Sequence, residues 1–398
     1  MDDNSQRINS PIPTAELERR WNAVRAAMER EHIDALVMQN RDDYMGGYVK
    51  YFSDQPATNG YPLTVIFPRD DGMTIINQGP FGAERDLPAG GDGLYRGVRR
   101  VMHTPSYVSA HFTAGYDAEL AARALKPYAR GAIGLVGSFS IGHAFAENLK
   151  RELSGAKFVE ASELVDRIKA VKSADELELI RKTALMQDAA LEAAFAAIEP
   201  GRTEMEIGAV AERVSHQLGS EQGLYLSASG PVGTPAFPNG RHTQNRVLRK
   251  GDHYTLLVEN SGAGGFYTEI ARTCVIGKAT DEMRDEVAFA TEARNFTLGM
   301  LRPGASCKDI WESFNRFMRE NGKPEEGRLY CHSQGYDLVE RPLVRFDEPM
   351  PLAANMVLAC HPTYFTRSAT VWICDDYLVG NGAPERLHRF PEKIVELG

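Results

Sequence analysis

The chain has 398 residues, 43% of them hydrophobic and 25% charged, with a formal net charge of −9. This length accommodates two domains of ordinary globular composition, and the negative charge disfavours a nucleic-acid-binding surface. No stretch approaches the roughly 20 apolar residues that span a membrane, and the polar, acidic N-terminal segment does not resemble a secretory signal, so we expect a cytoplasmic protein without membrane contact.

In the first part of the chain, the spacing of apolar residues predicts alternating helices and strands. Residues 16–33 carry apolar side chains at helical spacing. Apolar runs at 34–39, 62–68, 72–78 and 132–137 predict buried strands, and 110–129 and 144–153 predict helices. This alternation predicts an N-terminal α/β domain over residues 1–165.

The second part begins with a strongly helical segment at 162–197, where Ser173 and Glu176 have the spacing of a capping box. Pro200 and Gly201 end that region, and a further helix is predicted over 203–219. Strands dominate after Tyr225, with helices at 281–301 and 307–321 between them. The pattern predicts an α+β domain over 166–398, with helices flanking an antiparallel sheet.

All five cysteines lie in the second part of the chain, and none forms a CxxC pair. An odd number without paired spacing disfavours a disulfide framework and predicts reduced thiols.

Five segments in order carry a family resemblance: residues 163–183, 199–212, 246–277, 332–342 and 375–379. The fourth, HSQGYDLVERP, is similar to an HGxGxxxHExP motif, and DDYLV in the fifth is similar to EDxxxV. Together they resemble the creatinase/Xaa-Pro aminopeptidase family. The resemblance implies a two-domain subunit, with a creatinase-like N-terminal domain and a C-terminal pita-bread catalytic domain. It also implies a homodimer in which the N-terminal domain approaches the partner's active site.

The departures from the family pattern concern its metal site. Metallopeptidases of the family hold two ions with two Asp, one His and two Glu, and the matching positions here are Val258, Glu269, His332, His361 and Cys374. A second, substrate-binding His becomes Val339, and an upstream His becomes Phe237 unless His242 replaces it. Two divalent ions need several hard carboxylate oxygens, so this set disfavours a two-metal peptidase.

Two interpretations of the remaining groups stay open. The first is a metal-free, cofactor-free acid/base site in which His332, His361, Glu269 and Glu259 transfer protons. The second is a single zinc or ferrous ion on Glu269, His332, His361 and Cys374, a chemically plausible set. A buried His is often only hydrogen-bonded and a buried Cys often only packed, but two imidazoles at former ligand positions favour a functional site.

Without a metal to supply hydroxide, proton-transfer chemistry is more accessible than hydrolysis of an unactivated amide. We therefore expect a lyase that cleaves a C–C or C–X bond of a small, aromatic metabolite. The alternatives are a creatinase-like C–N hydrolase, a mononuclear-metal or residual aminopeptidase-like hydrolase, and a non-catalytic binding module.

The segments expected around the pocket are rich in aromatic and cationic residues. Aromatics suit a planar substrate, although core packing explains them equally well, and an Arg can hold an anionic group. Arg272 and Arg345 are further cationic candidates, with Arg272 more readily explained as structural. The expected substrate contacts are Arg241, His242, Phe266, Tyr267, Tyr336, Glu340, Arg341, Tyr364, Trp372 and Asp375.

Overall fold

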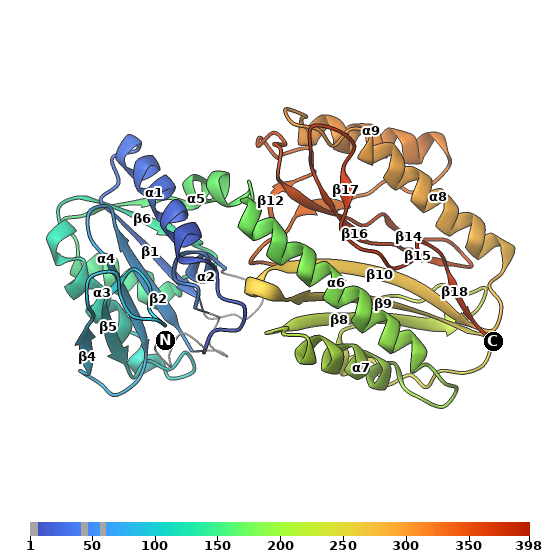
Figure 1. The fold of residues 1–398 in the computed structure, drawn as a ribbon, viewed down its shortest axis with the longest axis horizontal. Coiled ribbons are helices and arrows are strands. Elements are labelled where there is room, and N and C mark those ends of the chain that lie inside the picture. The colour runs from blue at the N-terminus through green and yellow to red at the C-terminus, as the bar shows by residue number, and fades with distance from the viewer. Residues whose placement is uncertain (1–6, 41–46, 56–60) are drawn as a thin grey trace. The chain divides into compact units, whose positions relative to one another are not determined.

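A computed structural model describes residues 7–40, 47–55 and 61–398. The chain forms two compact units, Met1–Lys169 and Ala170–Gly398, drawn in Figure 1. The sequence-based boundary at 165 falls inside a helix, α5 (Ser162–Lys169), that belongs wholly to the first unit. Among the described residues, no helix is long and apolar enough to cross a membrane.

The first unit is built on a seven-stranded mixed sheet with the order β4-β5-β3-β2-β1-β6-β7. The apolar runs form strands as predicted. Strands β1 and β2 are buried throughout because both of their faces are covered, whereas β3 and β6 are buried only in part. The predicted helix at 110–129 is instead a short α-helix between two 3₁₀ turns, since Pro127 cannot continue a helical hydrogen-bond ladder. Besides α5, its elements are α1 (Thr14–Arg30), β1 (Ala35–Asn40), α2 (Tyr48–Ser53), β2 (Leu63–Pro68), β3 (Met73–Gln78), β4 (Glu84–Asp86), β5 (Val98–Thr104), α3 (Tyr116–Ala124), β6 (Ala132–Val136), α4 (His143–Glu152) and β7 (Lys157–Glu160).

The second unit contains two larger antiparallel sheets and a two-stranded one. Their orders are β18-β10-β9-β8, in which β18 pairs parallel to β10, then β12-β11-β13-β16-β17, and β14-β15. The strands are β8 (Gly223–Pro231), β9 (Asp252–Ser261), β10 (Tyr267–Ile276), β11 (Cys331–Ser333), β12 (Glu340–Leu343), β13 (Val357–Cys360), β14 (Thr363–Phe365), β15 (Thr370–Trp372), β16 (Asp375–Leu378), β17 (Glu385–Arg386) and β18 (Val395–Leu397).

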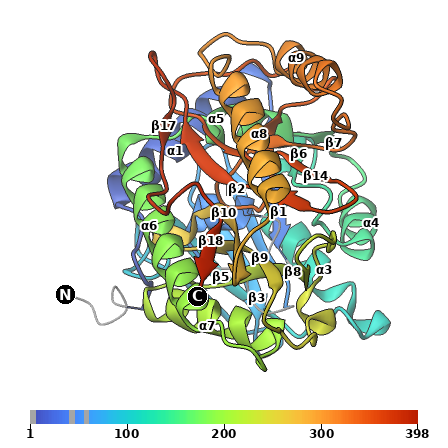
Figure 2. The same cartoon turned by 90° about the vertical axis from the view of Figure 1, so that its right-hand side faces the viewer.

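Four long helices cover these sheets: α6 (Ala174–Ala196), α7 (Glu204–Gln217), α8 (Asp281–Leu298) and α9 (Cys307–Glu320). Helices α6 and α7 lie against the β8–β10 sheet, and α8 and α9 lie over the other sheet (Figures 1 and 2). The predicted capping box is confirmed, because the Ser173 side chain accepts from the Glu176 N–H while Glu176 accepts from the Ser173 N–H. The fold agrees with the predicted α+β class.

Candidate active site

Two carboxylates face each other across the β9–β10 hairpin. Glu259 and Glu269 are directly paired in the strand register, and both are buried. Burial and the neighbouring Glu269 raise the pKa of Glu259 well above its ordinary range. Burial, with the added charge of Asp376, raises the pKa of Glu269 to about 7. Two like charges this close cannot both ionise easily, so the pair retains a proton near neutral pH.

The sequence motif placed the first expected metal ligand at Val258, but the side chain that faces the pocket is that of the next residue, Glu259. Val258 packs into the core formed with α6 and α7, whereas its neighbours Leu257 and Glu259 line the pocket. Side chains alternate between the faces of a strand, so a shift of one residue changes which side chain faces the site. The pocket therefore keeps a carboxylate, Glu259, on β9.

Two imidazoles complete the polar centre. His332 lies on β11 and His361 directly follows β13, with ring centroids 5.0 Å apart. The Ser333 carbonyl oxygen, 3.0 Å from His332 Nδ1, can only accept, so that nitrogen carries the proton and Nε2 is left with its lone pair. Burial lowers the pKa of His332 to about 4, and burial with His332 nearby lowers the pKa of His361 further below its ordinary range. Both rings are neutral at neutral pH.

The two imidazoles and one carboxylate are close enough to share one ion. The ligand atoms of Glu269, His332 and His361 all lie within 4.8 Å of one another. Glu269 Oε1 is 4.0 Å from His332 Nε2 and 3.8 Å from His361 Nε2. Two neutral imidazoles and a carboxylate are a donor set that zinc and ferrous ions accept. Among the described residues, this is the one set grouped closely enough to hold an ion, and its donor atoms fit a metal ion.

Cys374 occupies the position where the family pattern expects a carboxylate. Its Sγ donates to Glu269 Oε1 over 2.7 Å, and burial followed by the charge of Glu269 raises the pKa of the thiol. The residue is a buried hydrogen-bond donor to the ligand set in this structure.

A cavity of about 560 Å³ opens onto these groups, a size typical of small-molecule sites. Much of its wall is apolar, and the rings of Phe237 and Phe365 lie 4.5 Å apart in it. Val339 and Phe237, which stand where the family resemblance implies histidines, both line this wall. All four expected catalytic residues are among the described residues that line the pocket. Of the expected substrate contacts, only Trp372 is among these described lining residues.

The other predicted aromatics lie outside the described lining of this pocket. Phe266 packs against Tyr336 with ring centroids 4.4 Å apart, and Tyr267 is buried in β10. The Tyr364 hydroxyl donates to Glu286 on α8 over 2.7 Å. These four rings are buried and are not among the described residues that line the pocket.

Glu340 and Arg341 also have structural partners. Glu340 accepts from the backbone N–H groups of Tyr336 and Asp337 and lies 3.3 Å from the Lys172 ammonium group. The Arg341 guanidinium forms a two-bond ion pair with Glu348. The Glu340 contacts hold the loop between β11 and β12, and the Arg341–Glu348 pair holds the segment that follows β12.

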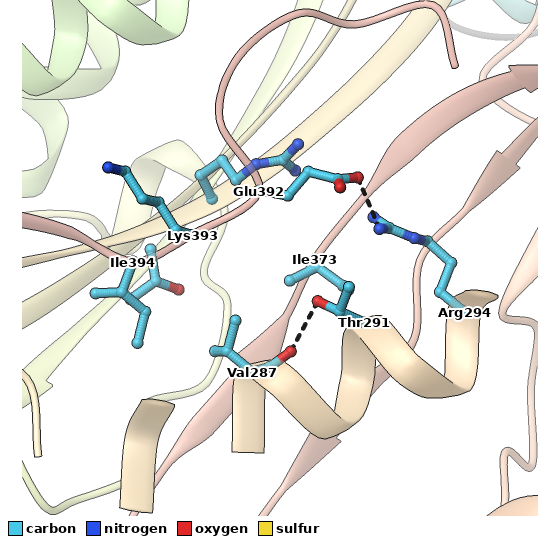
Figure 3. A pocket seen from close by; sticks show the side chains of 9 residues that line it. Val287, Thr291, Arg294, Ile373, Glu392, Lys393 and Ile394 are labelled. Carbon is cyan, nitrogen blue, oxygen red and sulfur yellow. Dashed lines mark hydrogen bonds and ion pairs between the residues drawn. The ribbon is translucent and has the colours of Figure 1, made fainter. Parts of the chain in front are cut away.

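Asp375 belongs to a buried ion-pair network. It pairs with Arg272 at 2.6 Å, and with Arg294 and Arg386 at 2.8 Å each. Arg294 also reaches Glu392 across the small cavity in Figure 3. That cavity, of about 10 Å³, has room for about one water molecule, so it is no substrate site. The network explains Asp375 as a structural residue.

The cationic candidates are distributed differently from the prediction. The side chain of Arg241 lies outside the described part of the chain, and His242 is exposed and does not appear in the described pocket lining. Arg345 pairs with Asp347 at the surface. Arg328, which no motif singled out, does line the pocket. Its proximity to His332 in the sequence was the one signal available.

Comparison with known proteins places this site in a family. A model of metallopeptidase family M24 matches residues 178–381, more than half of the chain. The chain belongs to metallopeptidase family M24. Among M24-like curated relatives, an uncharacterized hydrolase/peptidase, y4tL, of Sinorhizobium fredii is 28% identical over 331 residues, covering 80% of each chain. An Xaa-Pro dipeptidase of Pyrococcus furiosus is 25% identical over 271 residues, covering 66% of this chain and 75% of that protein.

Solved structures agree on the fold. The X-Pro aminopeptidase of Thermotoga maritima superposes with a TM-score of 0.77 at 20% identity, covering 94% of this chain and 99% of its own. The dipeptidase PepE of Mycobacterium ulcerans has a TM-score of 0.75 at 21% identity, covering 97% and 99%. These likenesses confirm the two-domain M24 architecture predicted from the motifs.

Proposed function

We propose that this M24 protein is a hydrolase that cleaves a C–N bond of a small molecule and holds one divalent metal ion on Glu269, His332 and His361. The observation that carries the proposal is the convergence of their ligand atoms within 4.8 Å of one another. The relatives named as dipeptidases and hydrolase/peptidase favour hydrolysis over the lyase chemistry expected from the sequence.

The residues around this set have distinct roles. The Ser333 carbonyl fixes the tautomer of His332 and aims Nε2 at Glu269. A divalent ion bound there would polarise the scissile carbonyl group and lower the pKa of a water molecule. The Cys374 thiol donates to Glu269 Oε1, the oxygen that faces both imidazoles, so a metal ion there would compete with this hydrogen bond.

Glu259 is the proposed proton carrier. It lies outside the three-residue ligand set but opposite Glu269, and Gln334 Nε2 donates to its Oε1 over 2.9 Å. A divalent ion held by Glu269 would displace the proton that the two carboxylates share, which would leave Glu259 ionised. In hydrolysis, the ionised Glu259 takes a proton from the attacking water as the C–O bond forms. It then delivers that proton to the leaving nitrogen as the C–N bond breaks.

A panel of dipeptides and N-acyl amino acids tests this function. Protein stripped of metal and reconstituted with Zn²⁺, Fe²⁺ or Mn²⁺ should release free amines, detectable by mass spectrometry. Glu259→Gln should lower kcat by at least about a hundredfold, as for loss of a general base. No turnover of any member of the panel with any of the three ions would overturn the proposal.

Metal-independent proton transfer is a second candidate, as in the lyase expectation. The buried Glu259–Glu269 pair favours it, because a proton held between two carboxylates is available to a substrate. Under this alternative, stripped protein turns over its substrate at the full rate, and chelators have no effect.

A further inference from the structure

Two kinds of residue line the pocket. The first kind is the acidic and imidazole groups already described. The second kind is apolar and includes Leu226, Leu257, Phe237, Phe365 and Trp372. A substrate that fills this space needs an apolar portion for these residues and a scissile polar bond near Glu269.

One cation interrupts this arrangement. Arg328 lies shortly before β11 and is the one Lys or Arg among the described residues that line the pocket. In the described part of the chain its guanidinium group has no ion-pair or hydrogen-bond partner, whereas Arg341 and Arg345 nearby are each paired with a carboxylate.

The position of this charge relates it to the reacting centre. Arg328, His332 and His361 line the same cavity. A guanidinium group left unpaired at the edge of a small-molecule cavity offers a two-bond fork to an anion.

We propose that Arg328 binds a carboxylate of the substrate, so that the substrate class is small N-acyl amino acids with an apolar side chain. The inference rests on the proposed hydrolase function and adds its specificity. The carboxylate meets Arg328, the apolar side chain meets the wall with Phe365 and Trp372, and the amide lies at Glu269.

The charge of the pocket favours a carboxylate over a phosphate. Glu259 and Glu269 line the same cavity, and a dianion would be repelled by them more strongly than a monoanion. A single guanidinium group also matches the planar, two-oxygen geometry of a carboxylate.

Calorimetric binding to the metal-reconstituted protein tests the inference with three probes: N-acetyl-phenylalanine, its C-terminal amide, and phenyl phosphate. The wild-type protein should bind the acid at least about tenfold more tightly than the amide, as for loss of a charged hydrogen-bonded pair. Arg328→Gln should remove this preference while leaving the affinity for the amide unchanged, and Arg328→Lys should keep part of it.

Arg345→Gln is the matched control, since Arg345 is an exposed arginine paired with Asp347 away from the pocket lining. It should behave as wild type, and unchanged melting temperatures should show that all variants fold.

Equal binding of acid and amide, a preference retained in Arg328→Gln, or tighter binding of phenyl phosphate would each overturn the inference. Binding and turnover are measured separately. A preference for the carboxylate without any hydrolysis would contradict only the proposed function. Hydrolysis with equal kcat/KM for acid and amide forms sinks only the role of Arg328.

Discussion

Cys374 donates its thiol proton to Glu269, with Sγ and Oε1 2.7 Å apart. A thiol at a former carboxylate position thus engages the one carboxylate of the metal-ligand set. Cys374, which replaces one expected metal ligand, therefore contacts another, Glu269. Replacing Cys374 can show whether its thiol competes with a metal ion or binds it.

Cys374→Ala should raise the affinity for Zn²⁺ by roughly fivefold to tenfold, because a metal would no longer displace the hydrogen bond to Glu269. Competition with a chromogenic chelator measures this. Cys274→Ala removes an equally buried thiol from a hydrophobic core and should leave zinc affinity unchanged. A fall in affinity in Cys374→Ala would instead mean that the thiolate is a ligand.

Removing either imidazole should abolish the metal site. His332→Ala and His361→Ala should each weaken Zn²⁺ binding by more than about a hundredfold, because each deletes one of three ligands. His242→Ala, an exposed histidine outside the described pocket lining, serves as the control. Unchanged zinc affinity in both ligand variants would show that the ion binds elsewhere.

Asp375 should matter for stability rather than for substrate binding. Asp375→Asn leaves Arg272 and Arg294 buried without their carboxylate, which costs about 3–5 kcal/mol for a broken buried pair. Asp347→Asn breaks an exposed pair and should leave the free energy of unfolding nearly unchanged. Urea denaturation measures both. A rise in KM for Asp375→Asn with unchanged stability would restore Asp375 as a substrate contact.

The buried His388 predicts a pH-dependent stability. It lies 3.3 Å from Asp188 and 3.5 Å from Asp376, and although burial alone would lower its pKa, these carboxylates raise it to about 9. Because the folded pKa exceeds the unfolded value, this contribution is complete below about pH 6.5 and is lost as the pH rises through 9.

His388→Gln should therefore be less stable than wild type at pH 6, by on the order of 2–3 kcal/mol, and the difference should shrink toward pH 10. Denaturation curves across this range give the comparison. Parallel stability profiles for the two proteins would show that His388 is neutral in the folded state.

The sequence was most informative where local chemistry decides the structure. The capping box at Ser173, the apolar strands and the ordered motifs around His332 predicted the elements, the fold class and the polar centre. Each of these depends on residues close together in the chain, or on a family pattern that spans it.

The pocket wall depended on register and on long-range packing instead. Whether Val258 or Glu259 faces the site follows from strand alternation, which a one-residue offset in a motif reverses. Arg328 lies outside every motif, so only the folded chain places it at the pocket. The partners of Tyr364 and Asp375, which are Glu286 and the buried arginines, could not be predicted because they are distant in sequence.

Metal stoichiometry tests the central claim most directly. Protein reconstituted with Zn²⁺, freed of loose ions and measured by plasma mass spectrometry, should hold one equivalent per chain, and hydrolytic activity should rise in proportion to occupancy. Two equivalents per chain, or full activity in protein that holds none, would contradict the assignment of a one-metal hydrolase site to Glu269, His332 and His361.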